Sequence, residues 1–222
     1  MQKLNILGVA LTDYSLKESL VLLEDYIKSG RLNTILYITP PVLILAGQDE
    51  EQKKCIEAMD LTLCGDVDLL RVAKIDSSSR AYEVENRIFL KEFLRRLVRG
   101  SRKIYLLGES EEELEALRRE LDAFQKGLVI SGSSVIAEDT EEIINRINDV
   151  APTAIISRIS HGKQEKYMSE FKPFANAEVW LGISKDMVLG TNKEPFRNRI
   201  MGKIYKKIFH SRMNRFKDEN GE

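Results

Sequence analysis

Two short polar segments of this sequence carry residues that could do chemistry. The apolar run that starts at Ala154 ends in Ser160-His161-Gly162, and the apolar run over 61–64 ends in Gly65-Asp66. A histidine titrates near neutral pH and can carry a proton, and a carboxylate at the C-terminal end of a strand can deprotonate a hydroxyl group as a general base. Small, donor-rich residues after a strand mark the rim where α/β proteins bind ligands. We therefore expect proton transfer at such a rim, with Asp66 as the leading candidate base.

Each of these residues also has an ordinary structural interpretation. Asp66 could accept the free backbone N–H groups at the start of the next helix, and Asp68 is the stronger candidate for that capping role. His161 could be a surface residue of a loop. Thr39 ends another apolar strand pattern, where it could take part in catalysis by binding substrate or simply end the strand before Pro40. The sequence leaves these alternatives open.

A helix-like segment follows the histidine directly and begins with Lys163, Gln164 and Glu165. A lysine and amide donors near the N-terminus of a helix would favour an anionic ligand such as a diphosphate. A solvated helix start is the alternative. We predict that His161 and these three residues contact substrate.

Alternating strand and helix patterns surround these segments. Strand patterns cover 5–11, 34–39, 61–64, 103–107, 128–131, 154–157 and 179–183, and Trp180 is expected in the core. Helix patterns cover 15–27, 42–58, 68–73, 84–98, 110–124, 140–148, 163–171 and 195–216, with loops at 76–80 and 188–194. Ser15 and Glu18 have the spacing of a capping box. This order predicts an α/β fold with a largely parallel sheet and helices on both faces.

The length and composition fit one core rather than two full domains. With 222 residues, of which 43% are hydrophobic, the chain can form an α/β domain over 1–190 and an appendage over 191–222. No segment approaches the roughly 18–20 apolar residues that cross a bilayer, and the first residues lack a secretory signal, so we expect a cytoplasmic protein. The two cysteines and two histidines, at 55, 64, 161 and 210, are not spaced for a zinc site or a disulfide framework. We expect no metal and no cofactor.

The C-terminal segment is strongly basic. Eight Lys or Arg residues and no Asp or Glu lie between 196 and 217, which leaves about −9 on the rest of a chain whose net charge is −1. Ile200, Ile204 and Ile208 recur at helical spacing beside these cations, a pattern typical of a helix that lies on an anionic membrane. Docking of the apolar stripe on the core is the alternative, and nucleic-acid binding is disfavoured because the aromatic residues follow the apolar face. The predicted membrane or acceptor contacts are Arg197, Arg199, Lys203, Lys206 and Lys207.

Taken in order, several motifs resemble the WecG/TagA/CpsF glycosyltransferase family over nearly the whole chain. The likeness begins at Ile6-Leu-Gly-Val9, and its most specific part is Gly162-Lys-Gln-Glu-Lys166. The other matching segments are Thr39-Pro40, Ala58-Met-Asp-Leu61, Ile104-Tyr-Leu-Leu-Gly108, Gly182, Gly190-Thr191 and the basic tail. The resemblance implies inverting transfer of N-acetylmannosamine, or a related sugar, from a UDP-sugar to a polyprenyl-diphosphate-linked sugar, without a required metal. It also implies a peripheral location at the cytoplasmic face of the plasma membrane.

The motifs that carry the family's chemistry are altered in this chain. The family's Pro-Asp-Gly, whose Asp is its proposed base, corresponds to Cys64-Gly65-Asp66, so the carboxylate is displaced by one residue. The family's Thr-Pro-Asn-Ala-(Glu/Asp)-His is shortened after Thr39-Pro40-Pro41-Val42 and lacks its Asn and His. Three further motifs, Thr-Gly-Ser-Asp, Gly-x-Gly-x-Pro and Gly-Gly-x-Phe-Asp, are replaced by Glu85-Asn86-Arg87-Ile88, Arg158-Ile159-Ser160-His161-Gly162 and Ser184-Lys185-Asp186-Met187.

Two hypotheses about function follow from this pattern. The first is a peripheral glycosyltransferase with a divergent site that uses Asp66 and Thr39 in catalysis. The second is a catalytically degenerate relative that binds a partner glycosyltransferase, a lipid or a nucleotide sugar without turnover. Expected partners are a UDP-sugar donor, a polyprenyl-linked acceptor, an anionic membrane surface, and either a second copy of the chain or a partner glycosyltransferase, with no nucleic acid.

Overall fold

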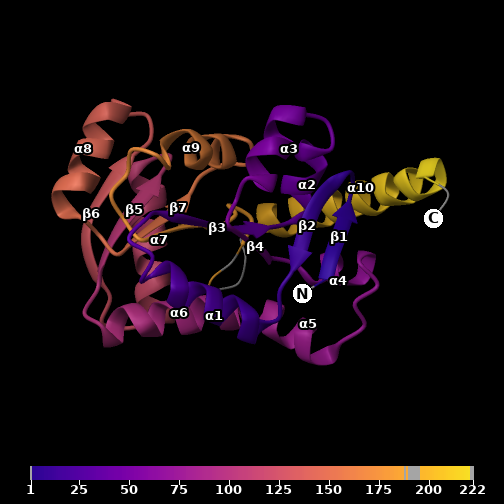
Figure 1. Ribbon diagram of the computed structural model, residues 1–222. Helices are drawn as coiled ribbons and strands as arrows, with labels where there is room; N and C mark the ends of the chain where they lie inside the picture. Colours follow the sequence, from indigo (N-terminus) through magenta and orange to yellow (C-terminus); the bar gives the residue numbers. More distant parts are fainter. Residues whose placement is uncertain (1, 188, 190–195, 221–222) are drawn as a thin grey trace.

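A computed structural model of the protein (Figure 1) describes residues 2–187, 189 and 196–220, with the side chains of the last segment over 202–219. The predicted loop at 188–194, apart from Leu189, lies outside the described residues. So do Pro195 and the family-like pair Gly190-Thr191. The side chains of Arg197 and Arg199 lie outside them as well.

Six parallel strands form the central sheet, in the order β4-β3-β8-β7-β5-β6. The strands are β3 (Asn33–Ile38), β4 (Leu61–Cys64), β5 (Lys103–Gly108), β6 (Val129–Val135), β7 (Ala154–Arg158) and β8 (Val179–Gly182). The inner strands β3, β8 and β7 are buried along almost their whole length, because helices cover both faces of the sheet. The predicted α/β fold with a largely parallel sheet is confirmed.

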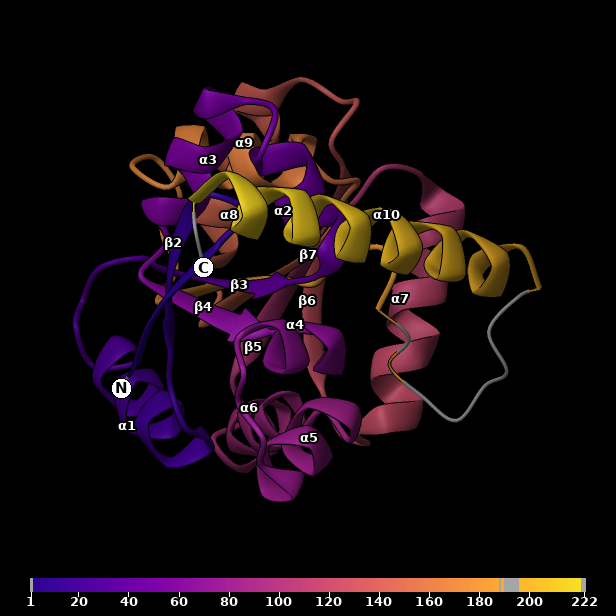
Figure 2. The same cartoon turned by 90° about the vertical axis from the view of Figure 1, so that its right-hand side faces the viewer.

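The helices lie in two layers around this sheet, as Figure 2 shows. One apolar cluster joins the sheet to α1, α6 and α7, and another joins its opposite face to α2, α3, α8, α9 and α10. The helices are α1 (Leu16–Tyr26), α2 (Pro40–Ala46), α3 (Glu50–Glu57), α4 (Val67–Val72), α5 (Ser78–Glu85), α6 (Ile88–Arg99), α7 (Glu111–Phe124), α8 (Thr140–Val150), α9 (Lys163–Phe171) and α10 (Phe196–Asn220). The predicted capping box of Ser15 and Glu18 is present at the start of α1.

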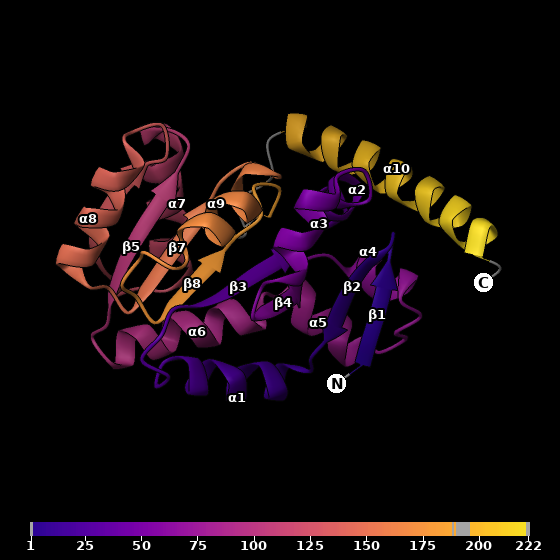
Figure 3. The same ribbon diagram turned by 45° about the horizontal axis from the view of Figure 1, so that its top comes forward.

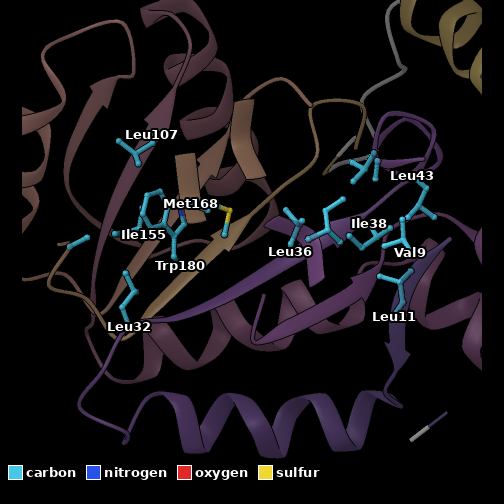
Figure 4. Close-up of a cluster of buried hydrophobic side chains, with 14 of the residues drawn as sticks. Val9, Leu11, Leu32, Leu36, Ile38, Leu43, Leu107, Ile155, Met168 and Trp180 are labelled. Carbon is cyan, nitrogen blue, oxygen red and sulfur yellow. The ribbon is translucent and has the colours of Figure 1, made fainter. Parts of the chain in front are cut away.

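Trp180 of β8 lies within the second of these clusters (Figure 4). Its side chain is fully buried, and its Nε1 donates a hydrogen bond to Ser157 Oγ over 3.0 Å. Tyr167 of α9 meets it edge-on, with the ring centroids 6.0 Å apart. Because a buried indole N–H needs an acceptor, the hydroxyl of Ser157 fixes how the ring sits in the core. The predicted core position of Trp180 is confirmed.

The predicted single strand at 5–11 is wrong. The segment forms an antiparallel hairpin of β1 (Gln2–Ile6) and β2 (Val9–Asp13), which lies beside the edge strand β4 (Figure 3). Leu7 and Gly8 make the turn with φ of 52° and 80°, and two positive φ values suit a two-residue hairpin. The sequence misled because a leucine, rather than Asn or Asp, precedes the glycine, so the apolar run continues through the turn.

Two predicted helices are also divided. The helix pattern at 42–58 splits at Gly47 into α2 and α3, and Asp49 caps α3 by accepting two backbone N–H groups. The pattern at 84–98 spans two helices. The first, α5, begins at Ser78 within the predicted polar loop, and the second, α6, begins at Ile88. Ser77 caps α5 from inside that loop. The second break, between α5 and α6, falls at Arg87, whose left-handed φ of 53° interrupts the helix without a capping side chain.

The C-terminal helix α10 packs along α2 (Figure 3). Phe209 and Met213 are buried in the core cluster, whereas Ile204 and Ile208 are 45% and 38% exposed. The apolar residues of the tail therefore lie on two faces of the helix, one docked on the core and one open. No helix in the described part of the chain is long and apolar enough to cross a membrane.

This division predicts different costs for two neighbouring truncations. Phe209→Ala should lower the free energy of unfolding by about 3 kcal/mol, because it leaves a cavity between α10 and the core. Ile208→Ala, the matched control on the open face, should change it by less than about 0.5 kcal/mol. Urea unfolding of both variants measures the difference, and equal losses would contradict the docked arrangement.

Candidate active site at the carboxyl ends of the strands

Three neighbouring strands bring polar side chains to one edge of the sheet. Thr39 follows β3, Ser184 follows β8 and His161 follows β7, and β8 lies between the other two strands. Because the strands are parallel, their carboxyl ends meet at the same edge, where ligands bind in open α/β sheets. Ser184 contacts both Thr39, which lies 145 positions away in the sequence, and His161, which lies 23 positions away.

Asp186 joins them into one network, which we call the rim cluster: Thr39, His161, Ser184 and Asp186. Asp186 Oδ1 lies 3.2 Å from both Thr39 Oγ1 and His161 Nε2, and it accepts a short hydrogen bond from Ser184. Burial acts to raise the pKa of Asp186, but the hydrogen bond and charge of His161, with the Ser184 hydroxyl, outweigh it and lower the pKa below its ordinary value. The cluster therefore holds a carboxylate anion at neutral pH.

Thr39 has a hydroxyl that its own helix does not use. It occupies the N-cap position of α2, yet its side chain makes no capping hydrogen bond. The helix begins with Pro40 and Pro41, which have no N–H groups to satisfy. The Thr39 hydroxyl is buried and bonds instead to Ser184 Oγ, over 3.1 Å, and to Asp186.

Asp66 lies at the end of the next strand, β4, and caps a helix. Its Oδ1 accepts the backbone N–H of Asp68 at the start of α4 over 2.8 Å, so the capping role that the sequence assigned to Asp68 belongs to Asp66. Lys206 of α10 reaches the same carboxylate at 3.3 Å and that of Asp68 at 2.9 Å. Whether Asp66 also acts as a base stays a prediction.

The Lys163-Gln164-Glu165 segment begins α9, as predicted, but two of its side chains are turned inward. Gln164 accepts the N–H of Ile159 over 3.1 Å and donates to the carbonyl of Ile183 over 3.3 Å, which ties the ends of β7 and β8 together. Glu165 accepts the N–H of Gly162 over 2.7 Å and so caps its own helix. Both are buried, whereas Lys163 is 71% exposed. Of the three, only the lysine is open to a ligand from solvent.

Comparison with known families agrees with this architecture. The sequence profile of the glycosyl transferase WecG/TagA/CpsF family matches residues 4–195. The chain belongs to this family. No curated protein sequence matches it. Membership makes it a glycosyltransferase of the WecG/TagA/CpsF type, and the family implies a nucleotide-sugar donor, a lipid-linked acceptor and a role in polysaccharide biosynthesis.

Two charged residues of this WecG/TagA/CpsF member extend the site beyond the sequence predictions. Glu109, directly after β5, accepts hydrogen bonds from Ser160 and Lys185, each over 2.7 Å. Desolvation acts to raise its pKa, but these bonds and the nearby lysines lower the pKa to about 2. Arg87 adopts a left-handed φ of 53° and donates to the carbonyl of Gly65 over 2.9 Å, next to Asp66. Position at a strand's carboxyl end was the signal that could have found Glu109.

Two hollows adjoin this edge of the sheet. A cavity of about 60 Å³ lies near the end of β4, and its lining includes Tyr37, Cys64 and Arg87. Burial raises the pKa of the Cys64 thiol to about 12, so it is protonated at neutral pH. An open groove of about 440 Å³ borders His161 and Lys163. No group of three or more His, Cys, Asp or Glu side chains that could hold a metal occurs among the residues whose placement is described.

The capping role of Asp66 predicts a pattern of stability changes. Asp66→Ala should lower the free energy of unfolding by about 1 kcal/mol, because the N–H of Asp68 loses its acceptor. Asp66→Asn keeps an acceptor and should lose only a few tenths of a kcal/mol. Urea unfolding measures both, with Asp76→Ala in an exposed loop position as the control. Equal losses for the Ala and Asn variants would argue against capping.

Proposed function

We propose that this protein transfers an N-acetylmannosamine-like sugar from a UDP-sugar to a polyprenyl-diphosphate-linked acceptor at the inner face of the plasma membrane. The single observation that carries the proposal is the convergence of hydroxyl, imidazole and carboxylate groups at the carboxyl ends of β3, β8 and β7. Transfer to a hydroxyl acceptor needs groups that orient that hydroxyl and take its proton. Membership of the WecG/TagA/CpsF family supplies the reaction class.

The donor's diphosphate is proposed to bind beside α9. Lys163 is exposed at the N-terminus of this helix and borders the open groove, so its charge and the positive end of the helix dipole both favour an anion there. Thr39 and Asp66, which end the adjacent strands β3 and β4, would then border the reacting sugar. Gln164 and Glu165 support this arrangement by fixing the loop rather than by touching the nucleotide.

A second function, binding without turnover, has its own supporting observation. The carboxylate of Asp66 already contacts a helix N–H and an ammonium group, and the best-kept motif residues Gln164 and Glu165 are used inside the fold. Transfer of radiolabelled sugar to a polyprenyl-diphosphate-linked acceptor tests the two functions against each other. Donor binding with no labelled product would favour the second function, binding without turnover.

Donor binding predicts a gain in thermal stability. A ligand that binds only the folded state stabilises it by about 2.7 kcal/mol at roughly 100 times its Kd, so UDP-N-acetylhexosamine should raise the Tm. Lys163→Ala should weaken that rise without changing the Tm of the free protein. Lys126→Ala, an exposed lysine after α7, is the matched control and should behave like the natural protein. No rise with any UDP-sugar up to millimolar concentration would contradict donor binding.

The open face of α10 is proposed to hold the protein on anionic lipid. Lys203 and Lys207 are exposed beside Ile204 and Ile208, and each cation near an anionic surface contributes about 1 kcal/mol. Lys203→Glu with Lys207→Glu should therefore weaken sedimentation with anionic vesicles at low salt by more than about 10-fold, and salt should release the natural protein. This pair leaves the Lys206 ion pairs intact.

A matched charge reversal on the opposite layer controls for net charge. Lys17→Glu with Lys28→Glu changes two exposed lysines in and just after α1 and should leave vesicle binding nearly unchanged. If both double variants bind vesicles as the natural protein does, the membrane contact is not made by this face of α10.

A further inference from the structure

We infer that His161, held by Asp186, is the group that accepts the proton of the acceptor hydroxyl. The inference rests on the proposed sugar transfer and assigns its base to a residue other than the displaced carboxylate of Asp66. It follows from the geometry of the rim cluster, from the access that His161 has to the open groove, and from the contacts that Asp66 already makes.

The imidazole of His161 is oriented from two sides. Its Nε2 lies 3.2 Å from Asp186 Oδ1, and its Nδ1 lies 3.4 Å from Ser184 Oγ. A carboxylate accepts hydrogen bonds and does not donate them, so the contact with Asp186 favours the tautomer that carries its proton on Nε2. Nδ1 then has a free lone pair, which is what a general base needs.

The Ser184 hydroxyl does not consume that lone pair. Ser184 has a single proton, and its short hydrogen bond runs to Asp186. The contact between Ser184 Oγ and His161 Nδ1 is longer, at 3.4 Å, and a substrate hydroxyl that reaches this nitrogen would replace it. Thr39 adds a second hydroxyl bond to the same carboxylate. Asp186 is therefore a fixed anion that orients the ring and stabilises the imidazolium that forms.

His161 is also within reach of a substrate. Its side chain is 18% exposed and lines the open groove of about 440 Å³. The charged or titratable groups that line this groove with it are Asp49, which caps α3, and Lys163, Lys166, Tyr167 and Glu170 of α9. Lys166 pairs with Asp49 and Glu51, and Lys163 pairs with Glu109. The carboxylate in direct contact with the imidazole is that of Asp186, which lies outside the lining of this groove.

Asp66 is less suited to the same task in this conformation. Its Oδ1 accepts the N–H of Asp68 in the first turn of α4, and both carboxylate oxygens lie within 3.4 Å of Lys206 Nζ. To take a proton from substrate, Asp66 would have to give up contacts that fix a helix and the tail. When His161 takes a proton on Nδ1, it keeps the contact between its Nε2 and Asp186.

The acceptor oxygen forms a bond to the anomeric carbon of the donor sugar while its proton moves to Nδ1 of His161. The bond between the anomeric carbon and the β-phosphate oxygen breaks, and UDP leaves with the electron pair. The imidazolium then releases its proton to solvent, and the side chain is ready for another turnover.

Steady-state transfer of labelled sugar, with UDP-N-acetylmannosamine and a polyprenyl-diphosphate-linked acceptor, tests the inference. His161→Gln should lower kcat by about 100-fold or more, while the rise in Tm with UDP-N-acetylhexosamine stays as in the natural protein. His210→Gln, which changes the other histidine of the chain on an exposed position of α10, is the matched control and should keep kcat.

Asp186→Asn tests the positioning role by its pH profile. It should lower kcat and move the acidic limb of the profile to lower pH, because the imidazolium loses the anion that stabilises it. Asp186→Glu should restore part of the activity. A residue that merely held the loop would change stability without moving that limb.

The outcomes separate the inference from the proposed function. A natural protein that makes no labelled product overturns the proposed function and the inference together. A natural protein that is active, with His161→Gln equally active, overturns the inference alone. So does loss of turnover in Asp66→Asn with turnover kept in His161→Gln, since the base would then be Asp66.

Discussion

The site depends on the position of β8 between β3 and β7. This strand is the last of the sheet in sequence but lies near its middle, so its pairing is formed by segments far apart in the chain. Parallel pairing on both sides brings Ser184 and Asp186 between Thr39 and His161. A shift of β8 by one residue would turn its buried side chains to the opposite faces and move the rim cluster apart. The apolar burial of Trp180 and Leu181 therefore stabilises the register on which the polar contacts rely.

The position of the Asp66 carboxylate depends on the glycine before it. Asp66 follows Gly65, and no side chain fits at position 65, because a Cβ there would lie 2.8 Å from the carbonyl oxygen of Ile38. The Asp66 carboxylate lies at the N-cap of α4, where backbone N–H groups attract an anion. Lys206 then reaches both Asp66 and Asp68 from α10. The tail and the end of β4 thus share one ion-pair network.

Much of the fold could be predicted from the sequence, since strands buried on both faces are continuous apolar runs and most helices show clear periodicity. The start and end of α9 agree with its pattern at 163–171. The hairpin turn at Leu7 could not be recognised, because leucine rarely adopts a positive φ. In α10, spacing alone could not tell that Phe209 would be buried and Ile208 left open.

The site was predictable only in part, for a different reason. Position at strand ends indicated Thr39, Asp66 and His161, because that rule needs no knowledge of strand order. The contact between His161 and Asp186 depends on β7 and β8 being neighbours, which a single sequence does not reveal. The inward orientation of Gln164 was hidden too. Gly182 makes it feasible, since a Cβ on that strand residue would lie 3.1 Å from the amide nitrogen of Gln164.

The buried bonds of Gln164 and Glu165 have an entropic consequence. Gly162 takes a φ of 84°, and the two side chains hold its own N–H and that of Ile159 before any ligand arrives. The loss of conformational freedom in this loop occurs during folding and is not repeated when substrate binds. Binding energy from the nucleotide is then available for orienting the sugar rather than for ordering the protein. The Gly162-Lys-Gln-Glu-Lys166 segment would thus act as a rigid frame, set in advance, for the rim cluster.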